Sequence, residues 1–125
     1  MTLAWIFLFI AGAFEIGWPL GFKLFDKSGH IVYLALSIVS MAVSGFFLYH
    51  AQKSIPIGTA YAVWTGIGAT GTFLIGLFFF DDKLAFARCF GVFCIIVGVI
   101  TLELSERHGA DSRKPSVVTT GQDER

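Results

Sequence analysis

The hydrophobic pattern of this chain consists of four long apolar runs separated by short polar links. The runs cover residues 3–20, 31–49, 58–80 and 84–102. Each run has 18 to 23 residues, and a helix of about 20 residues crosses the hydrocarbon core of a bilayer. Because short links make consecutive helices antiparallel, the pattern predicts an all-α integral membrane protein with four transmembrane helices.

The composition agrees with this prediction, since 55% of the residues are hydrophobic and 14% are charged, whereas a soluble domain is about one quarter charged. The first run lacks a basic start and a small-residue cleavage site, so we expect it to remain as a helix and not to be removed as a signal peptide. We therefore expect a multi-pass protein of the cell inner (plasma) membrane, with the lipid bilayer around it. Because the net charge is zero, we expect no basic surface that would bind nucleic acid.

The composition changes after Leu104. Residues 1–104 form the predicted membrane domain, and residues 105–125 are polar and contain Pro115 and Gly121. Because polar segments bury too little apolar surface to offset the entropy of ordering, we expect a disordered tail over 105–125.

Glu15 is the only ionisable residue of the first run. A carboxylate in hydrocarbon is costly and marks a functional site by default. The alternative is a structural carboxyl that is protonated or paired with a cation, but no other run has a cation near its middle. Gly12 and Trp18 share the face of Glu15 at a spacing of three, so we expect Gly12 to leave room for the carboxylate and Trp18 to offer an N–H donor. Pro19 has no N–H, which predicts a kink or an unpaired carbonyl at Glu15.

Polar side chains on the second and third runs complete the candidate site. Ser44 can donate to a carboxylate, although serine often bonds to its own helix. Tyr61 and Trp64 suit a small cation, because they combine aromatic faces with polar tips; the alternative is an interfacial aromatic belt. Gly66 and Gly68 predict a helix hinge, and close helix packing explains these two glycines equally well.

The fourth run carries small residues that suit contact with a second copy. Gly91 and Gly98 lie on one face seven residues apart and allow close helix approach; packing within one protomer is the alternative. Cys89 and Cys94 fit no metal motif, and we expect them to be packing residues. The chain has no nucleophile–base pair and no phosphate loop, so we expect neither an enzyme nor a protein with a metal or another cofactor.

The basic residues do not favour one orientation in the membrane. The side that holds the N-terminus, the second link and the tail carries four of them, as does the opposite side: Lys53, Arg107, Arg113 and Lys114 against Lys23, Lys27, Lys83 and Arg88. Because the basic residues are divided evenly, the positive-inside rule favours neither orientation. The even division predicts insertion in both orientations and an antiparallel homodimer. The alternative is that the basic residues of the tail fix a single topology.

Three stretches resemble the small multidrug resistance family, and together the resemblance covers nearly all of residues 3–104. They are residues 11–18 (AGAFEIGW), 21–23 (GFK) and 55–69 (IPIGTAYAVWTGIGA). Within the family, a Trp three residues after the membrane Glu and the sequence Trp-Thr-Gly are typical of the guanidinium exporters. Pro19 and the long tail depart from the pattern of that subtype.

The resemblance implies an antiparallel homodimer that exports guanidinium and small substituted guanidines by proton-coupled alternating access. It implies that Glu15 binds protons and substrate alternately. The hydrogen-bonding shell around Glu15 would comprise Trp18, Ser44, Tyr61 and Trp64, with Gly12 shaping the pocket. Two alternatives stay open: a broad exporter of quaternary ammonium and other multidrug cations, and a non-transporting subunit of a heterodimeric membrane complex.

Overall fold

The computed structural model describes residues 2–112 of the chain, and this part is built of helices without strands. The four helices are α1 (Thr2–Ser28), α2 (Ile31–Ala51), α3 (Ile57–Phe79) and α4 (Phe86–Ser112). All four contain a span that is long and apolar enough to cross a membrane. The predicted all-α membrane fold is therefore confirmed.

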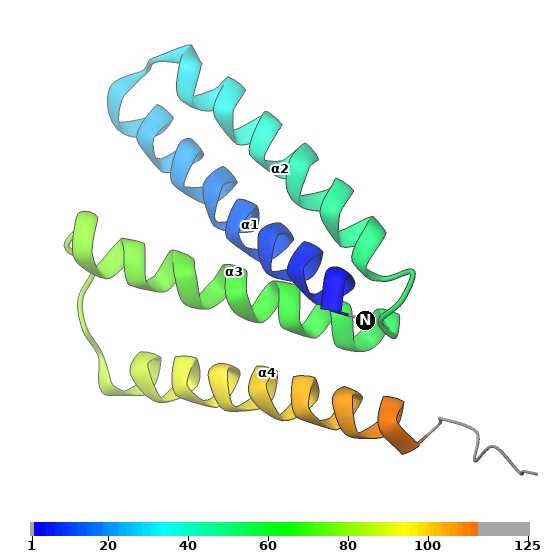
Figure 1. The fold of residues 1–125 in the computed structure, drawn as a ribbon. Helices are drawn as coiled ribbons and strands as arrows, with labels where there is room; N and C mark the ends of the chain where they lie inside the picture. Colours follow the sequence, from blue (N-terminus) through cyan, green and yellow to red (C-terminus); the bar gives the residue numbers. More distant parts are fainter. Residues whose placement is uncertain (1, 113–125) are drawn as a thin grey trace, which may run out of the picture.

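The helices do not lie side by side in chain order (Figure 1). Helix α1 lies between α2 and α3, and α4 packs on the other side of α3. The spatial order is therefore α2, α1, α3, α4, with α1 and α3 in the middle. This order places Glu15 of α1 between helices that approach it from both sides.

Helices α1 and α2 pack closely because glycines of α1 face serines of α2. A Cβ atom added at Gly17 would overlap the side chain of Ser40, and one added at Gly21 would overlap Ser37. The Ser40 hydroxyl also donates to the carbonyl oxygen of Phe14 at 2.6 Å. Small residues four apart allow this approach in membranes, so the Gly17–Gly21 spacing is a sequence signal for the contact that the apolar runs alone do not give.

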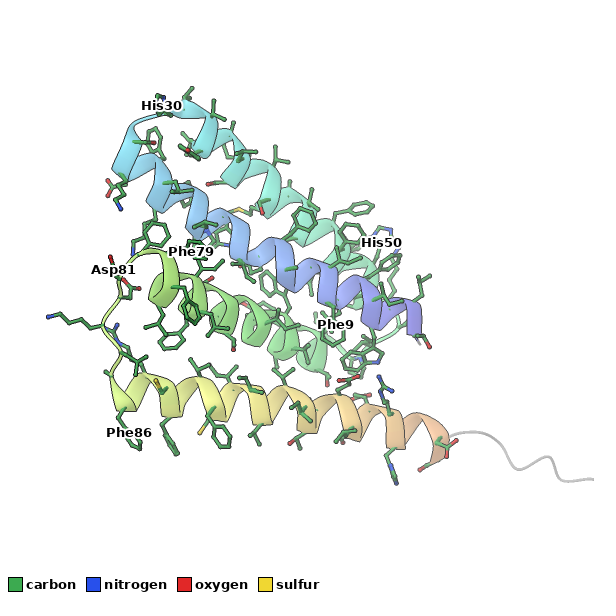
Figure 2. All side chains as sticks on the ribbon, turned by 60° about the vertical axis from the view of Figure 1, so that its left-hand side comes forward. Phe9, His30, His50, Phe79, Asp81 and Phe86 are labelled. Atoms are coloured by element: carbon green, nitrogen blue, oxygen red, sulfur yellow. The ribbon has the colours of Figure 1, made fainter. Side chains whose placement is uncertain are left out.

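The buried apolar core lies near the end of the molecule where α1 begins. It unites the start of α1, the end of α2 with the following link, and the start of α3, through Ala4, Trp5, Leu8, Ala51, Ile55, Ala60 and Val63. Val99 and Leu102 of α4 pack against this core. At the opposite end α4 is scarcely covered, and Phe86 projects outward with 86% of its surface exposed (Figure 2).

Helix α1 is longer than the apolar run that predicted it. It continues through the interior Pro19 and ends at Ser28, not at Leu20. Gly29 stops it, because this glycine adopts a left-handed φ of 71° and its N–H donates to the carbonyl of Phe25 at 2.7 Å, a common way to end a helix. The apolar run marks the membrane-crossing part, whereas the helix itself runs further into the polar link.

Helix α4 also passes its predicted end. It begins at Phe86 instead of Leu84 and reaches Ser112 instead of Leu102, so the expectation of disorder from residue 105 is wrong for residues 105–112. An ion pair between Glu103 and Arg107, one turn apart, supports the extra turns. The rest of the expected tail, with Arg113 and Lys114, lies outside the described residues, and the division at residue 104 stays a prediction.

A polar contact joins α1 to the link between α3 and α4. The Lys23 ammonium lies 3.4 Å from an oxygen of Asp82 and 4.5 Å from the ring centre of Phe80. Asp81, beside them at the end of α3 (Figure 2), has a φ of 52°. Lys23 and Asp82 are each about half exposed, so the pair contributes little to stability.

Candidate cation site

Each of the two oxygens of the Glu15 carboxylate has a hydrogen-bond donor within reach. Trp18, one turn further along α1, donates its indole N–H to Oε1 at 2.7 Å. Ser44 of α2 lies with its hydroxyl 3.0 Å from Oε2. Because both donors come from packed helices, the carboxylate has a fixed orientation in the protomer.

Ser44 links the carboxylate to a third helix. Its side chain is fully buried, and its oxygen accepts the indole N–H of Trp64 from α3 at 2.9 Å. The same hydroxyl lies 2.8 Å from the carbonyl oxygen of Ala11. A hydroxyl has one proton, so Ser44 donates either to Glu15 or to Ala11 at any moment. Trp64 is therefore connected to Glu15 through Ser44, and its role in the substrate shell stays a prediction.

The backbone of α3 approaches Glu15 at Gly68. A Cβ atom added there would lie 2.7 Å from Cγ of Glu15 and 3.3 Å from its Cβ. Gly66 faces α4, where an added Cβ would lie 2.6 Å from Val99 and 3.1 Å from Ile95. Both glycines thus allow close packing, and α3 is helical throughout this region. The predicted hinge at Gly66 and Gly68 stays a prediction, while the clearance for Glu15 at Gly68 is an additional role.

Gly12 is buried on α1, and its Cβ position faces α3. The atoms nearest to an added Cβ all belong to Ile67, the closest at 2.7 Å. The space that Gly12 leaves is therefore filled by a side chain of α3. In this protomer Gly12 allows α1 and α3 to approach closely, and its role in shaping the pocket stays a prediction.

Tyr61 and the glycines of α4 face away from the site in the protomer. The centre of the Tyr61 ring lies 5.2 Å from that of Trp64, with the two ring planes tilted by 54°, but 57% of the surface of Tyr61 is exposed, and its hydroxyl has no hydrogen-bond partner among residues 2–112. An added Cβ at Gly91 or Gly98 would meet no atom within 4 Å. Their roles in the substrate shell and in dimer contact remain predictions.

The arrangement can hold a proton or a small cation. Glu15 is partly exposed, and a carboxylate has about four lone-pair positions. One hydrogen bond to each oxygen leaves an acceptor position free on both. Within the described part of the chain, no three His, Cys, Asp or Glu side chains gather as a metal site would require. The free acceptor positions on the two oxygens can take a proton or a cation that donates hydrogen bonds.

Known proteins resemble the chain over most of its length. The family model described as Small Multidrug Resistance protein matches residues 3–96. A guanidinium exporter of Yersinia pseudotuberculosis is 42% identical over 103 residues, which are 82% of this chain and 99% of that protein. Guanidinium exporters of Proteus vulgaris and Salmonella typhimurium are 39% and 37% identical, again over 82% of this chain and over 99% and 98% of theirs.

The family match and the four membrane-spanning helices agree on a multi-pass membrane protein. In bacteria such a transporter lies in the inner membrane. With three quarters of the chain matched by the family model and relatives similar over nearly their whole length, the protein belongs to the small multidrug resistance family.

Proposed function

We propose that this protein exports guanidinium and small substituted guanidines in exchange for protons, by alternating access. One observation carries the proposal: the Glu15 carboxylate is oriented through both of its oxygens by Trp18 and Ser44. The names of the similar exporters support guanidinium as the substrate. The role is transport without chemical conversion.

Guanidinium fits this carboxylate because its geometry is complementary. It is planar and offers only N–H donors, and two of them can bond to the two oxygens of a carboxylate in parallel. The Trp18 and Ser44 bonds fix the plane of the carboxylate while leaving an acceptor position on each oxygen. A quaternary ammonium ion has no N–H, so it would gain nothing from this orientation.

Proton coupling follows from competition for the same two oxygens. When a cation is bound, Glu15 is ionised and the Ser44 hydroxyl donates to it. When Glu15 takes up a proton, its O–H can donate to Ser44, which then turns its own proton to the Ala11 carbonyl, 2.8 Å away. Ser44 has two lone pairs, so it can accept from Trp64 and from Glu15 together. Each state thus has satisfied hydrogen bonds, and the two states exclude one another.

A second copy inserted in the opposite orientation would complete the transport cavity. Glu15 is partly exposed, and Tyr61 and the open face of Gly91 and Gly98 are available for contact. Two antiparallel protomers would bring two copies of Glu15 to a shared cavity, as in an inverted repeat. Exchange of the two halves would then alternate the access from one side of the membrane to the other.

The test is a comparison of cations on reconstituted protein. Transport currents on a supported membrane should be strong for guanidinium and for singly substituted guanidines. They should be weak for tetrapropylammonium, since a site built on hydrogen bonds rejects an analogue without donors by up to about 10⁴-fold. Glu15→Gln is the control that should carry neither current. Equal currents for tetrapropylammonium and guanidinium would instead indicate a broad multidrug exporter.

A further inference from the structure

The C-terminal turns of α4 contact the first turn of α3. The Thr59 hydroxyl donates to Oε1 of Glu106 at 3.2 Å, and both residues are partly buried. Glu106 lies beyond residues 3–96, which the family model covers, and the similar exporters match only 103 of the 125 residues of this chain. The acceptor of this hydrogen bond, but not its donor, thus lies outside the residues that the family model matches.

The first turn of α3 is poorly stabilised by its own residues. Pro56 precedes the helix without a side-chain cap, and the first turn contains no acidic residue. Gly58 lies in this turn with no atom within 4 Å of its Cβ position, and glycine weakens a helix. The positive end of the helix dipole and its free N–H groups therefore lack local compensation. A carboxylate bonded to Thr59 supplies a negative charge at this end.

Glu106 extends the stripe of α4 that packs on α3. Ile95, Val99, Leu102 and Glu106 are spaced by four, three and four residues, which places them on one helix face. Ile95 and Val99 contact Gly66, and Leu102 packs against the core. Glu103, by contrast, pairs with Arg107 on its own helix. Of the two glutamates, Glu106 alone reaches α3 by a hydrogen bond in the described residues.

The anchored turn leads directly into the candidate site. Thr59 precedes Tyr61 by two residues and Trp64 by five, and Trp64 is the donor to Ser44. Fraying or rotation of the first turns of α3 would therefore weaken the bond that holds Ser44 against Glu15.

We propose that Glu106 is a positioning residue: by holding Thr59, it fixes the first turns of α3 and keeps Trp64 in place for guanidinium binding. The part that concerns guanidinium rests on the proposed function; the part that concerns α3 does not. The extension of α4 thereby gives this protein a determinant of substrate affinity remote from Glu15.

The first test measures amide hydrogen exchange in residues 57–64 of the full-length protein, by mass spectrometry in membrane mimetics. Glu106→Ala should speed exchange in this segment by about tenfold, the factor that corresponds to about 1.4 kcal/mol and to the loss of one charge-assisted bond. Thr59→Val should have a similar effect, and adding Glu106→Ala to it should add little. Glu103→Ala is the matched control: it removes only an exposed i,i+4 pair, worth about 0.3–0.5 kcal/mol, so it should speed exchange in this segment far less than Glu106→Ala. Equal exchange in the two glutamate variants would overturn the proposal.

The second test measures transport of guanidinium by the same variants. Glu106→Ala should raise KM several-fold with little change in kcat, because it weakens the orientation of the binding carboxylate through Trp64 and Ser44. Glu106→Gln, which keeps an acceptor for Thr59, should restore part of the affinity. Faster exchange in residues 57–64 with an unchanged KM would overturn the positioning role. If the wild-type protein moved no guanidinium, the proposed function would fail, and the exchange rates would still decide whether Glu106 holds α3.

Discussion

Replacing Gly68 with alanine tests how closely the binding carboxylate is fitted. The new methyl carbon would lie 2.7 Å from Cγ of Glu15, whereas carbon atoms in contact are about 3.5–4.0 Å apart. Glu15 must then move by about 1 Å, although bonds of 2.7 and 3.0 Å hold it to Trp18 and Ser44. Overpacking of this kind costs about 1–3 kcal/mol. We therefore expect guanidinium affinity to fall by about 5- to 150-fold.

The measurement is titration calorimetry of guanidinium binding, combined with transport rates on the same preparations. Gly45→Ala is the matched control, because it gains helix propensity in the interior of α2 while its Cβ meets no atom within 4 Å. If Gly68 serves only as a hinge, its replacement should slow transport and leave binding unchanged. Wild-type affinity in Gly68→Ala would refute the claim that Gly68 makes room for Glu15.

Three further predictions address the donors and the topology. Trp18→Phe removes the indole N–H but keeps an aromatic ring. Because a hydrogen bond to a charged group contributes about 1.5–3 kcal/mol, this change should weaken guanidinium binding by about 10- to 150-fold. An affinity equal to that of the wild type would contradict the assigned bond. Ser44→Ala leaves the Trp64 N–H and one oxygen of Glu15 without their hydrogen-bond partner, so it should reduce transport strongly. Ser37→Ala loses only a bond to Tyr33 of its own helix and should transport normally. An equal loss of transport in both variants would indicate a packing effect. A cysteine at Ser28 should be labelled from both sides of the cell membrane in comparable amounts, and one-sided labelling of an active protein would rule out the antiparallel homodimer.

The sequence predicted the parts of the fold that depend on hydrophobic length. Four apolar runs gave four membrane-spanning helices, because a bilayer requires about 20 apolar residues from each. The helix ends were not predictable in this way, because the C-terminal turns of α1 and α4 are polar and lie beyond the apolar runs. Gly29 stops α1, and Glu103 and Arg107 support the last turns of α4. These are local signals that an apolar pattern does not contain.

The candidate site was predictable as a set of residue types but not as a set of contacts. Glu15 could be singled out because a lone acid in an apolar run is costly, and Trp18 followed from its spacing on the same helix. Contacts between helices depend on the spatial order α2, α1, α3, α4, which differs from the chain order. For that reason the close approach of Gly68 to Glu15 and the position of Ser44 between Trp64 and Glu15 could not be predicted from the sequence.

Proton release on addition of guanidinium tests the central claim most directly. Purified wild-type protein in weakly buffered detergent solution should release protons when guanidinium binds, and the release should saturate with the same concentration dependence as binding. Glu15→Gln should release none. Guanidinium binding without proton release in the wild type, or undiminished release in Glu15→Gln, would contradict the assignment of Glu15 as the shared site for protons and substrate.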